Sequence, residues 1–352
     1  MIITVTPNPA IDVTLTLDRL EPGQTHRVPP GIRRAGGKGI NVARVLKTMG
    51  ADAVAIAPVG TLDREWFAGN LGAVPSALLD VPGSVRQSTA LVEPHRTTIF
   101  NETGSNLGAW VWPALVESVE AQLADADCLV ISGSIPPGCP PSLYGSLVAV
   151  GRARGIPVIA DATGDALRSA AKAGATVLKP NASELVDTTG ESDPIAGARE
   201  LQALGAGLIL VSLGENGMIA VPRDATQPVL HARLDRVFAG NPTGAGDAAV
   251  AGVASVIAKS RIPVADGVSP TDHEHDSDSF DGHSSDVHSS DSHDLDTRAI
   301  LLRATAWSAA AVLEPLAGSI DPARVAGIEA ELHVAALPSV TPAPSIPAER
   351  KS

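Results

Sequence analysis

The sequence has few cysteines, few aromatic residues and no long apolar run. Its two cysteines, Cys128 and Cys139, cannot form a disulfide framework, and Cys128 falls in an apolar segment where we interpret it as a small buried hydrophobe. Aromatic residues make up 3% of the 352 residues. The core must therefore be built from Ala, Val, Leu and Ile, which suits a parallel sheet buried beneath helices.

The chain also lacks membrane and secretion signals. No apolar segment is long enough to span a bilayer, and residues 1–6 turn polar too soon to begin a signal peptide. We therefore expect a cytoplasmic protein without a membrane partner.

Basic residues are outnumbered: 26 Lys and Arg stand against 39 Asp and Glu, which gives a net charge of −13. This balance argues against a nucleic-acid partner, because nucleic acids are bound largely through Lys and Arg. It does not exclude anionic substrates, because local basic groups and helix N-termini bind phosphate whatever the overall charge.

Residues 271–294 carry much of the negative charge. They contain seven Asp, one Glu, five His and no Lys or Arg. Such a polar segment cannot offset the entropy lost on ordering, so we expect a disordered insertion over 268–296, and likewise a flexible tail over 337–352. The histidines and carboxylates are potential metal ligands, but their spacing matches no zinc motif. We favour a solvated loop over a metal site.

Short β-rich segments alternate with helical ones over most of the chain. This alternation predicts one α/β domain over 1–336, with a mostly parallel sheet covered by helices on both faces. The predicted strands are 2–6, 54–59, 128–132, 156–161, 176–179 and 208–213. The predicted helices are 40–49, 113–123, 141–154, 165–173 and 194–204. Ligands of such sheets bind at the carboxyl ends of the strands.

Two early segments, about 13–34 and 84–104, break the alternation. Each has strand-like stretches with no helix between them, and 85–92 followed by 97–101 predicts a hairpin. We expect these segments to form a small antiparallel lid over the site. An ordinary hairpin at the edge of the sheet is the alternative.

The first glycine-rich motif is Ala35-Gly36-Gly37-Lys38-Gly39-Ile40-Asn41, just before a predicted helix. Its glycines let a ligand approach the backbone, and the helix start offers free N–H groups. Lys38 adds a positive charge, and Asn41 extends from the first turn. The motif is neither a Walker A loop nor Gly-x-Gly-x-x-Gly. A tight turn with a solvated lysine is the alternative.

A second motif, Gly244-Ala245-Gly246-Asp247, opens an apolar helical run. A glycine-rich turn at a helix start is an anion site. Asp247 in the first turn suits an ordinary dipole-stabilising residue. It equally suits a base that accepts a proton from an attacking hydroxyl while N–H groups stabilise a transferring phosphoryl group.

Polar residues follow two further predicted strands. Lys179 leads into Asn181 and Glu184, which are one helical turn apart and could hold water around Mg²⁺. An N-capping role is equally suitable for Asn181. The segment 211–217 supplies a serine and glycines after the next strand.

Together these segments resemble the PfkB, or ribokinase-like, family of carbohydrate kinases. The resemblance covers nearly the whole chain outside 271–294 and the tail, and the motifs at 36–41 and 244–247 are highly specific for it. Residues 4–12 and 132–138 resemble the branch that acts on sugar phosphates, which includes 1-phosphofructokinase, tagatose-6-phosphate kinase and the minor 6-phosphofructokinase. The resemblance implies a ribokinase-like three-layer fold with a small β lid, and transfer of the γ-phosphoryl group of MgATP to a ketohexose monophosphate.

The resemblance also implies roles for individual residues. Asp12, at the end of the first predicted strand, would bind sugar hydroxyls with Gly37, Lys38 and Asn41, and Arg86 would bind the phosphate of the substrate through its bidentate fork. The residues implied at the ATP site are Lys179, Asn181, Ser212, Gly214 and Gly217, with the helix around 304–312 beside the adenine. Glu184 would hold Mg²⁺ through water. The implied catalytic residues are Gly244, Ala245 and Gly246 as the anion hole and Asp247 as the base.

Two departures affect the choice of substrate and the loop near the nucleotide. Asn241 stands where many relatives have Asp and looks more like tagatose-6-phosphate kinases, and 313–319 is an uncommon form of the family's Pro-Gly loop. We rank fructose 1-phosphate first as acceptor, then tagatose 6-phosphate, then fructose 6-phosphate. A non-catalytic sugar-phosphate-binding regulator is disfavoured because base and anion hole are both present, and a metal-buffering protein would depend on 271–294. A homodimer through the lid is a further implication.

Overall fold

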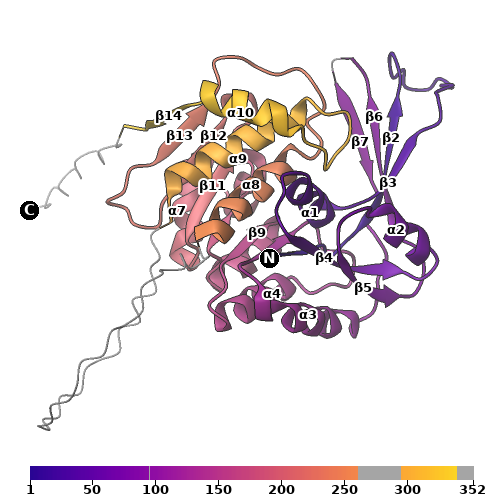
Figure 1. Cartoon of the computed structure of the whole chain (residues 1–352), viewed down its shortest axis with the longest axis horizontal. Coiled ribbons are helices and arrows are strands. Elements are labelled where there is room, and N and C mark those ends of the chain that lie inside the picture. The colour runs from indigo at the N-terminus through magenta and orange to yellow at the C-terminus, as the bar shows by residue number, and fades with distance from the viewer. Residues whose placement is uncertain (95, 261–294, 339–352) are drawn as a thin grey trace, which may run out of the picture.

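The computed structural model describes residues 1–94, 96–260 and 295–338. A ten-stranded sheet forms the middle layer, with helices on both faces (Figure 1). Its strands, in spatial order, are β14 (His333–Ala336), β13 (Leu230–Arg233), β12 (Met218–Val221), β11 (Leu208–Ser212), β10 (Val177–Leu178), β9 (Val158–Asp161), β8 (Cys128–Ser132), β1 (Ile2–Val5), β4 (Ala53–Gly60) and β5 (Ser76–Val81). The predicted three-layer α/β fold is confirmed.

The pairing within this sheet explains where a ligand can bind. From β5 to β11 all neighbouring strands are parallel, whereas β12, β13 and β14 extend the sheet antiparallel. The carboxyl ends of seven parallel strands therefore lie along one edge, where ligands of open α/β sheets bind.

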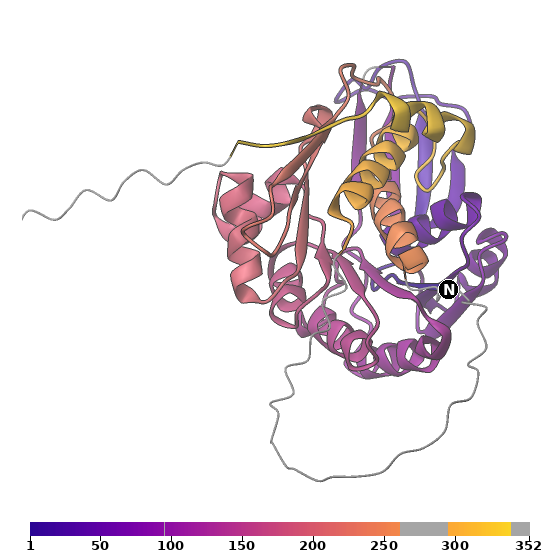
Figure 2. The same cartoon turned by 60° about the vertical axis from the view of Figure 1, so that its left-hand side comes forward.

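Two apolar cores hold the helices on the sheet. Alternate residues of a strand point to opposite faces, so that Cys128 and Val130 pack in one core, and Leu129 and Ile131 in the other. The first core includes residues of α1 (Lys38–Thr48), α2 (Arg64–Asn70), α8 (Ala245–Ser260), α9 (Thr297–Val312) and α10 (Pro322–Glu331). The second includes residues of α3 (Val111–Gln122), α4 (Ser142–Ala153), α5 (Gly164–Lys172), α6 (Ala182–Thr189) and α7 (Pro194–Leu204). Figure 2 shows the same layers from a view turned by 60°.

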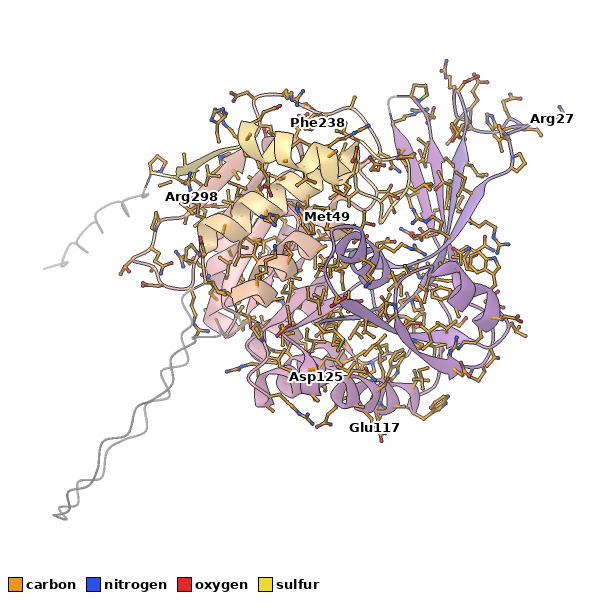
Figure 3. The ribbon with its side chains drawn as sticks, in the orientation of Figure 1. Arg27, Met49, Glu117, Asp125, Phe238 and Arg298 are labelled. Carbon is orange, nitrogen blue, oxygen red and sulfur yellow. The ribbon has the colours of Figure 1, made fainter. Side chains whose placement is uncertain are left out.

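A second, four-stranded sheet projects from the main body beside α1 and α2 (Figure 1). Its order is β3 (Ile32–Gly36), β2 (Ala10–Thr16), β6 (Arg86–Val92) and β7 (Thr97–Asn101). It is built from the two segments that were expected to form a lid, although β2 and β6 pair parallel rather than antiparallel. Arg27 lies at its outer tip, far from the main body (Figure 3).

Several short elements were not predicted. They are α2, α6, α10, β5, β12, β13 and β14. The last three strands are four residues long each, too short for a clear alternation of apolar and polar positions. The turn into β12 depends on Gly217, whose φ of +85° favours glycine and where a Cβ atom would lie 2.0 Å from the carbonyl oxygen of Ala232.

Most of the predicted insertion over 268–296 and of the predicted tail over 337–352 lies outside the described residues. The part that is described is tied to the domain: Asp296 caps α9 through the N–H of Ala299, and the N–H of Leu337 donates to the carbonyl of Val229. In the described part of the chain, no helix combines the length and apolar character needed to cross a bilayer.

Candidate active site

Four neighbouring strands deliver polar side chains to the carboxyl edge of the sheet. Ser132 ends β8, Asp161 ends β9, Lys179 directly follows β10, and Ser212 ends β11. Because these strands are parallel and adjacent, their ends meet. Two glycine-rich helix starts, those of α1 and α8, converge on the same edge.

The start of α1 is held close against β1 by its glycines. Gly37 has a φ of +104°, and a Cβ atom there would lie 2.8 Å from Cγ2 of Thr6. A Cβ atom on Gly39 would lie 2.4 Å from the hydroxyl oxygen of Thr6. Only glycine fits this approach. It places Lys38 and Asn41 over the strand ends.

The start of α8 presents Asp247. Gly244 has a φ of +87° and lies against the backbone of 317–318, where a Cβ atom would be 3.0 Å from Cα of Ala317. Asp247 is buried, and Asn41 donates from Nδ2 to its Oδ2 at 3.0 Å. The N–H of Ala245 already donates to the carbonyl of Pro242 at 3.1 Å, so the N–H groups that remain for an anion in the first turn are those of its neighbours.

A network of charges lies around this aspartate. The ammonium group of Lys38 lies 3.4 Å from Oδ2 of Asp161 and 3.6 Å from Oε1 of Glu184. The ammonium group of Lys179 lies 3.4 Å from Oδ1 of Asp161, and a Cβ atom on Gly246 would be 3.5 Å from it. Asp161 was missed in the sequence, although the predicted strand 156–161 ends on it. A carboxylate at the carboxyl end of a central strand is the signal that could have found it.

These charges set the protonation of the site. Burial raises the pKa of Asp247 to about 7; Lys38 and Lys179 and the hydrogen bond from Asn41 oppose the increase, whereas the negative charge of Asp161 adds to it. For Asp161, burial alone would raise the pKa, but the two ammonium groups and the hydroxyl of Ser132 outweigh it and hold the pKa below its usual value. The negative charge of Asp161, followed by those of Glu184 and Asp247, raises the pKa of Lys38.

A cavity of about 730 Å³ opens beside the start of α8. This volume is in the range of pockets that hold small molecules. Its lining includes four of the residues predicted for the ATP site, Asn181, Ser212, Gly214 and Gly217. Lining residues that the sequence did not indicate come mainly from the loop after β13, including Leu234, Val237 and Phe238, and from Thr97 of the second sheet. Phe238 is labelled in Figure 3, at the upper side of the main body.

The helix that was expected beside the adenine, around 304–312, is the C-terminal part of α9. Thr305, Ser308, Ala309 and Val312 of that helix line the cavity. The mostly apolar walls suit a flat aromatic group, and Ala245 and Gly246 from the first turn of α8 also line the cavity.

The position expected for Asp12 was wrong. It does not end the first strand: it lies within β2 of the second sheet, opposite Arg34 of β3. The chain turns at 7–9 between β1 and β2, so the carboxylate approaches the site from the second sheet. Burial raises its pKa to about 6, although Arg44, Arg86 and Arg34 and a hydrogen bond from Asn41 lower it.

A small cavity separates the second sheet from the loop after α9. It is lined by residues that include Asp12, Arg34, Ser88, Asn241 and Thr243. Arg34 donates to Oγ of Ser319 at 2.9 Å. Arg86, predicted to bind a phosphate, begins β6 and donates to the backbone carbonyls of Asn8 and Glu102.

The pair Asn181 and Glu184 forms a capping box at the start of α6. Oδ1 of Asn181 accepts the N–H of Glu184 at 2.8 Å, and Oε2 of Glu184 accepts the N–H of Asn181 at 2.9 Å. The capping role foreseen for Asn181 is thus present. Oε1 of Glu184 faces Lys38, and no cluster of three metal-ligating side chains occurs among the residues that the structure describes.

Asn241 fastens the loop after α9 to the start of α8. Its Nδ2 donates to the carbonyl of Pro315 at 3.0 Å, its Oδ1 accepts the N–H of Thr243 at 3.1 Å, and its own N–H donates to Val312. An aspartate could not donate the first of these bonds. The loop at 313–319 is therefore held by a hydrogen bond that requires Asn at position 241.

The sequence matches known proteins over most of its length. Residues 6–272 match the pfkB family of carbohydrate kinases. A 1-phosphofructokinase from Xanthomonas campestris pv. campestris is 35% identical over 275 residues, which are 72% of this chain and 83% of that protein.

Two solved structures share the fold. Phosphofructokinase-2 from Escherichia coli, in complex with potassium, has a TM-score of 0.76 at 24% identity and covers 94% of this chain and 98% of its own. A protein described as a possible 1-phosphofructokinase from Thermotoga maritima has a TM-score of 0.77 at 21% identity and covers 96% of this chain and 99% of its own.

Proposed function

Because the chain belongs to the pfkB family of carbohydrate kinases, we propose that it transfers the γ-phosphoryl group of ATP to a ketohexose monophosphate, with fructose 1-phosphate as the preferred acceptor. The observation that carries this proposal is Asp247: a buried carboxylate in the first turn of a helix, with a pKa raised to about 7 and two lysines nearby. A general base works best when its pKa lies near the operating pH. The relative from Xanthomonas campestris, itself a 1-phosphofructokinase, supports the choice of acceptor.

In the proposed reaction, Asp247 accepts the proton of the acceptor hydroxyl. The hydroxyl oxygen forms a bond to the γ-phosphorus, and the bond from that phosphorus to the bridging oxygen breaks, which releases ADP. The N–H groups of Gly246 and Asp247 and the ammonium groups of Lys38 and Lys179 stabilise the charge on the transferring group. Asn41 holds the carboxylate of Asp247 in place.

The nucleotide is proposed to lie in the 730 Å³ cavity, with its base against α9 and its phosphates toward Gly246. The residues suit a Mg²⁺ ion that is held mainly by phosphates and water, as is common for this ion. Both oxygens of Glu184 already have partners: Oε2 accepts a hydrogen bond in the capping box, and Oε1 pairs with Lys38. Glu184 therefore suits contact with the ion through water and not as a direct ligand. When bound, Mg²⁺ would neutralise charge on the phosphates.

The acceptor is proposed to bind between the second sheet and the loop after α9, with the second sheet as a lid. The cavity there has a volume of about 20 Å³, so the sheet must move outward to admit a sugar phosphate. Asp12 faces three guanidinium groups, those of Arg34, Arg44 and Arg86, so this region carries a surplus of positive charge. Buried charges need partners of opposite sign. The phosphate group of a sugar phosphate would supply the negative charge that these arginines need.

Arg34 offers a direct test of this placement. We expect Arg34→Ala to raise the KM for the sugar phosphate about tenfold or more, because a charge-assisted hydrogen bond contributes about 1.5–3 kcal/mol. Steady-state kinetics at saturating ATP measure the effect. Arg33→Ala is the matched control. Arg33 is the preceding residue of β3, and its guanidinium lies 5.1 Å from the centre of the Trp66 ring. The KM of this variant for the sugar phosphate should stay within about twofold of the wild-type value. Equal effects of both substitutions would remove Arg34 from the acceptor site.

The function itself is tested by ADP release in a coupled assay. Fructose 1-phosphate, tagatose 6-phosphate, fructose 6-phosphate and unphosphorylated fructose and tagatose are compared at equal concentrations. We expect the highest kcat/KM with fructose 1-phosphate. Turnover restricted to unphosphorylated sugars would refute the proposed substrate class while leaving the family unchanged.

A further inference from the structure

The charge network contains one carboxylate for which the proposed reaction has no use. Asp161 is completely buried, with 1% of its surface exposed, and it lies at the end of β9 in the middle of the sheet. Aspartate is almost never buried this deeply without partners. Here it has three: both lysines, and Ser132, whose hydroxyl donates to Oδ2 at 3.1 Å.

Each carboxylate oxygen of Asp161 pairs with a different lysine. Oδ2 faces the ammonium group of Lys38 from α1, and Oδ1 faces that of Lys179 after β10, each at 3.4 Å. The two lysines come from different elements and both contact this single carboxylate. For Lys179, which is 4% exposed, Asp161 is the one ion-pair partner among the described residues. The side chain of Lys38 is 39% exposed and forms ion pairs with both Asp161 and Glu184.

We propose that Asp161 is a positioning residue for phosphoryl transfer: it fixes the ammonium groups of Lys38 and Lys179 beside Gly246 and Asp247, where the transferring group would pass. The proposal rests on the proposed function. A lysine is a flexible point charge on a long stem, so a rigid anion beneath it is needed to hold the charge where the reaction needs it. Catalytic groups misplaced by about 1 Å lose about a hundredfold in rate.

The same carboxylate acts on the proposed base at a distance. The charged and polar groups that face Asp247 are Lys38 and Asn41 from α1, Lys179 after β10 and Asp161 from β9. Among them only Asp161 favours the protonated form of Asp247. Removal of its charge should therefore make Asp247 easier to ionise, which a residue with a purely structural role would not do.

The test uses Asp161→Asn, Lys179→Met and the double variant of the full chain, assayed with whichever acceptor the wild-type enzyme uses best. We expect Asp161→Asn to lower kcat at least tenfold while the KM for the acceptor changes less than threefold, because Asp161 does not line the acceptor cavity. The effects of Asp161→Asn and Lys179→Met should be non-additive, since one residue acts through the other. The acid limb of the kcat/KM profile should move to lower pH in Asp161→Asn.

Additive effects together with an unmoved acid limb would overturn the proposal and leave Asp161 a structural residue. If Asp161→Asn does not fold, Ser132→Ala replaces it, because it removes a single hydrogen bond to the same carboxylate. That variant should lose about two- to fivefold in kcat at 25 °C, with a Tm lowered by only several degrees, and an unchanged kcat would also overturn the proposal. A wild-type chain with no activity on any acceptor would refute the proposed function instead, so the two failures are distinguishable.

Discussion

Asp247→Asn is expected to lower kcat by about a thousandfold, within the 10²–10⁴ range that a general base contributes. Asn keeps the shape of the side chain but cannot accept the proton of the acceptor hydroxyl. It can still pair with Asn41, which donates to Oδ2 in the native enzyme. Binding of both substrates should therefore be largely retained, and the loss should appear in kcat rather than in KM. Steady-state ADP release, with binding measured calorimetrically, gives both quantities.

The pH dependence provides a second measurement on the same residue. A base must be ionised to act, so the kcat/KM of the native enzyme should fall as the pH drops through the pKa of Asp247, which burial raises to about 7. This acid limb should be absent in Asp247→Asn.

Asp165→Asn is the matched control for Asp247. Asp165 lies in the first turn of α5, is exposed, and interacts with the helix dipole in the same way. If Asp247 only stabilised its helix, both substitutions would lower Tm slightly and leave kcat similar. A kcat for Asp247→Asn within about threefold of that of the control would remove Asp247 as the base.

Lys38→Met is expected to lower kcat/KM by about a hundredfold or more. The ammonium group of Lys38 balances the charges of Asp161, Glu184 and Asp247, and without it Asp161 would keep only Lys179 as an ion-pair partner among the described residues. Charge on the transferring group would also lose a stabilising partner, and removal of one such donor costs about 10²–10³ in rate. Because Lys38 lowers the pKa of Asp247, the acid limb should shift to higher pH, opposite to the shift for Asp161→Asn.

The control for Lys38 is on the same helix. Lys47, in the last turn of α1, pairs with Asp52 at 3.3 Å near the surface. Lys47→Met should leave kcat/KM within about twofold, because exposed ion pairs contribute little. An acid limb that stays in place for Lys38→Met would contradict the assigned electrostatic coupling.

The sequence predicts the fold well where local signals are strong. The strands from 128–132 to 208–213 and the helices between them follow from alternating apolar segments, and the structure has them within about two residues. The β12–β14 extension was not predictable in this way, because its strands are short and its pairing links 230–233 with 333–336 across a hundred residues.

The site was predicted unequally for a similar reason. Glycine-rich motifs at 36–41 and 244–247 are visible in the sequence because close backbone approach requires glycine. Asp161 and Arg34 belong to no local motif: their roles arise only when β9 meets α1, or when β3 folds over the loop at 317–319. Asp12 was assigned to the wrong strand although Pro-Asn-Pro at 7–9 signals a turn. A turn signal does not show that the strand after it, β2, joins a separate sheet.

The helix α8 also separates the proposed reaction centre from an exposed, remote helix end. It has 16 residues, with Asp247 in the first turn at one end and Ser260 at the other. At about 1.5 Å per residue, Asp247 and Ser260 are about 20 Å apart along the helix axis. Lys259 and Ser260, at that remote end, are exposed. The side chains at these two positions can therefore be exchanged, or carry a label, at a distance from the proposed reaction centre.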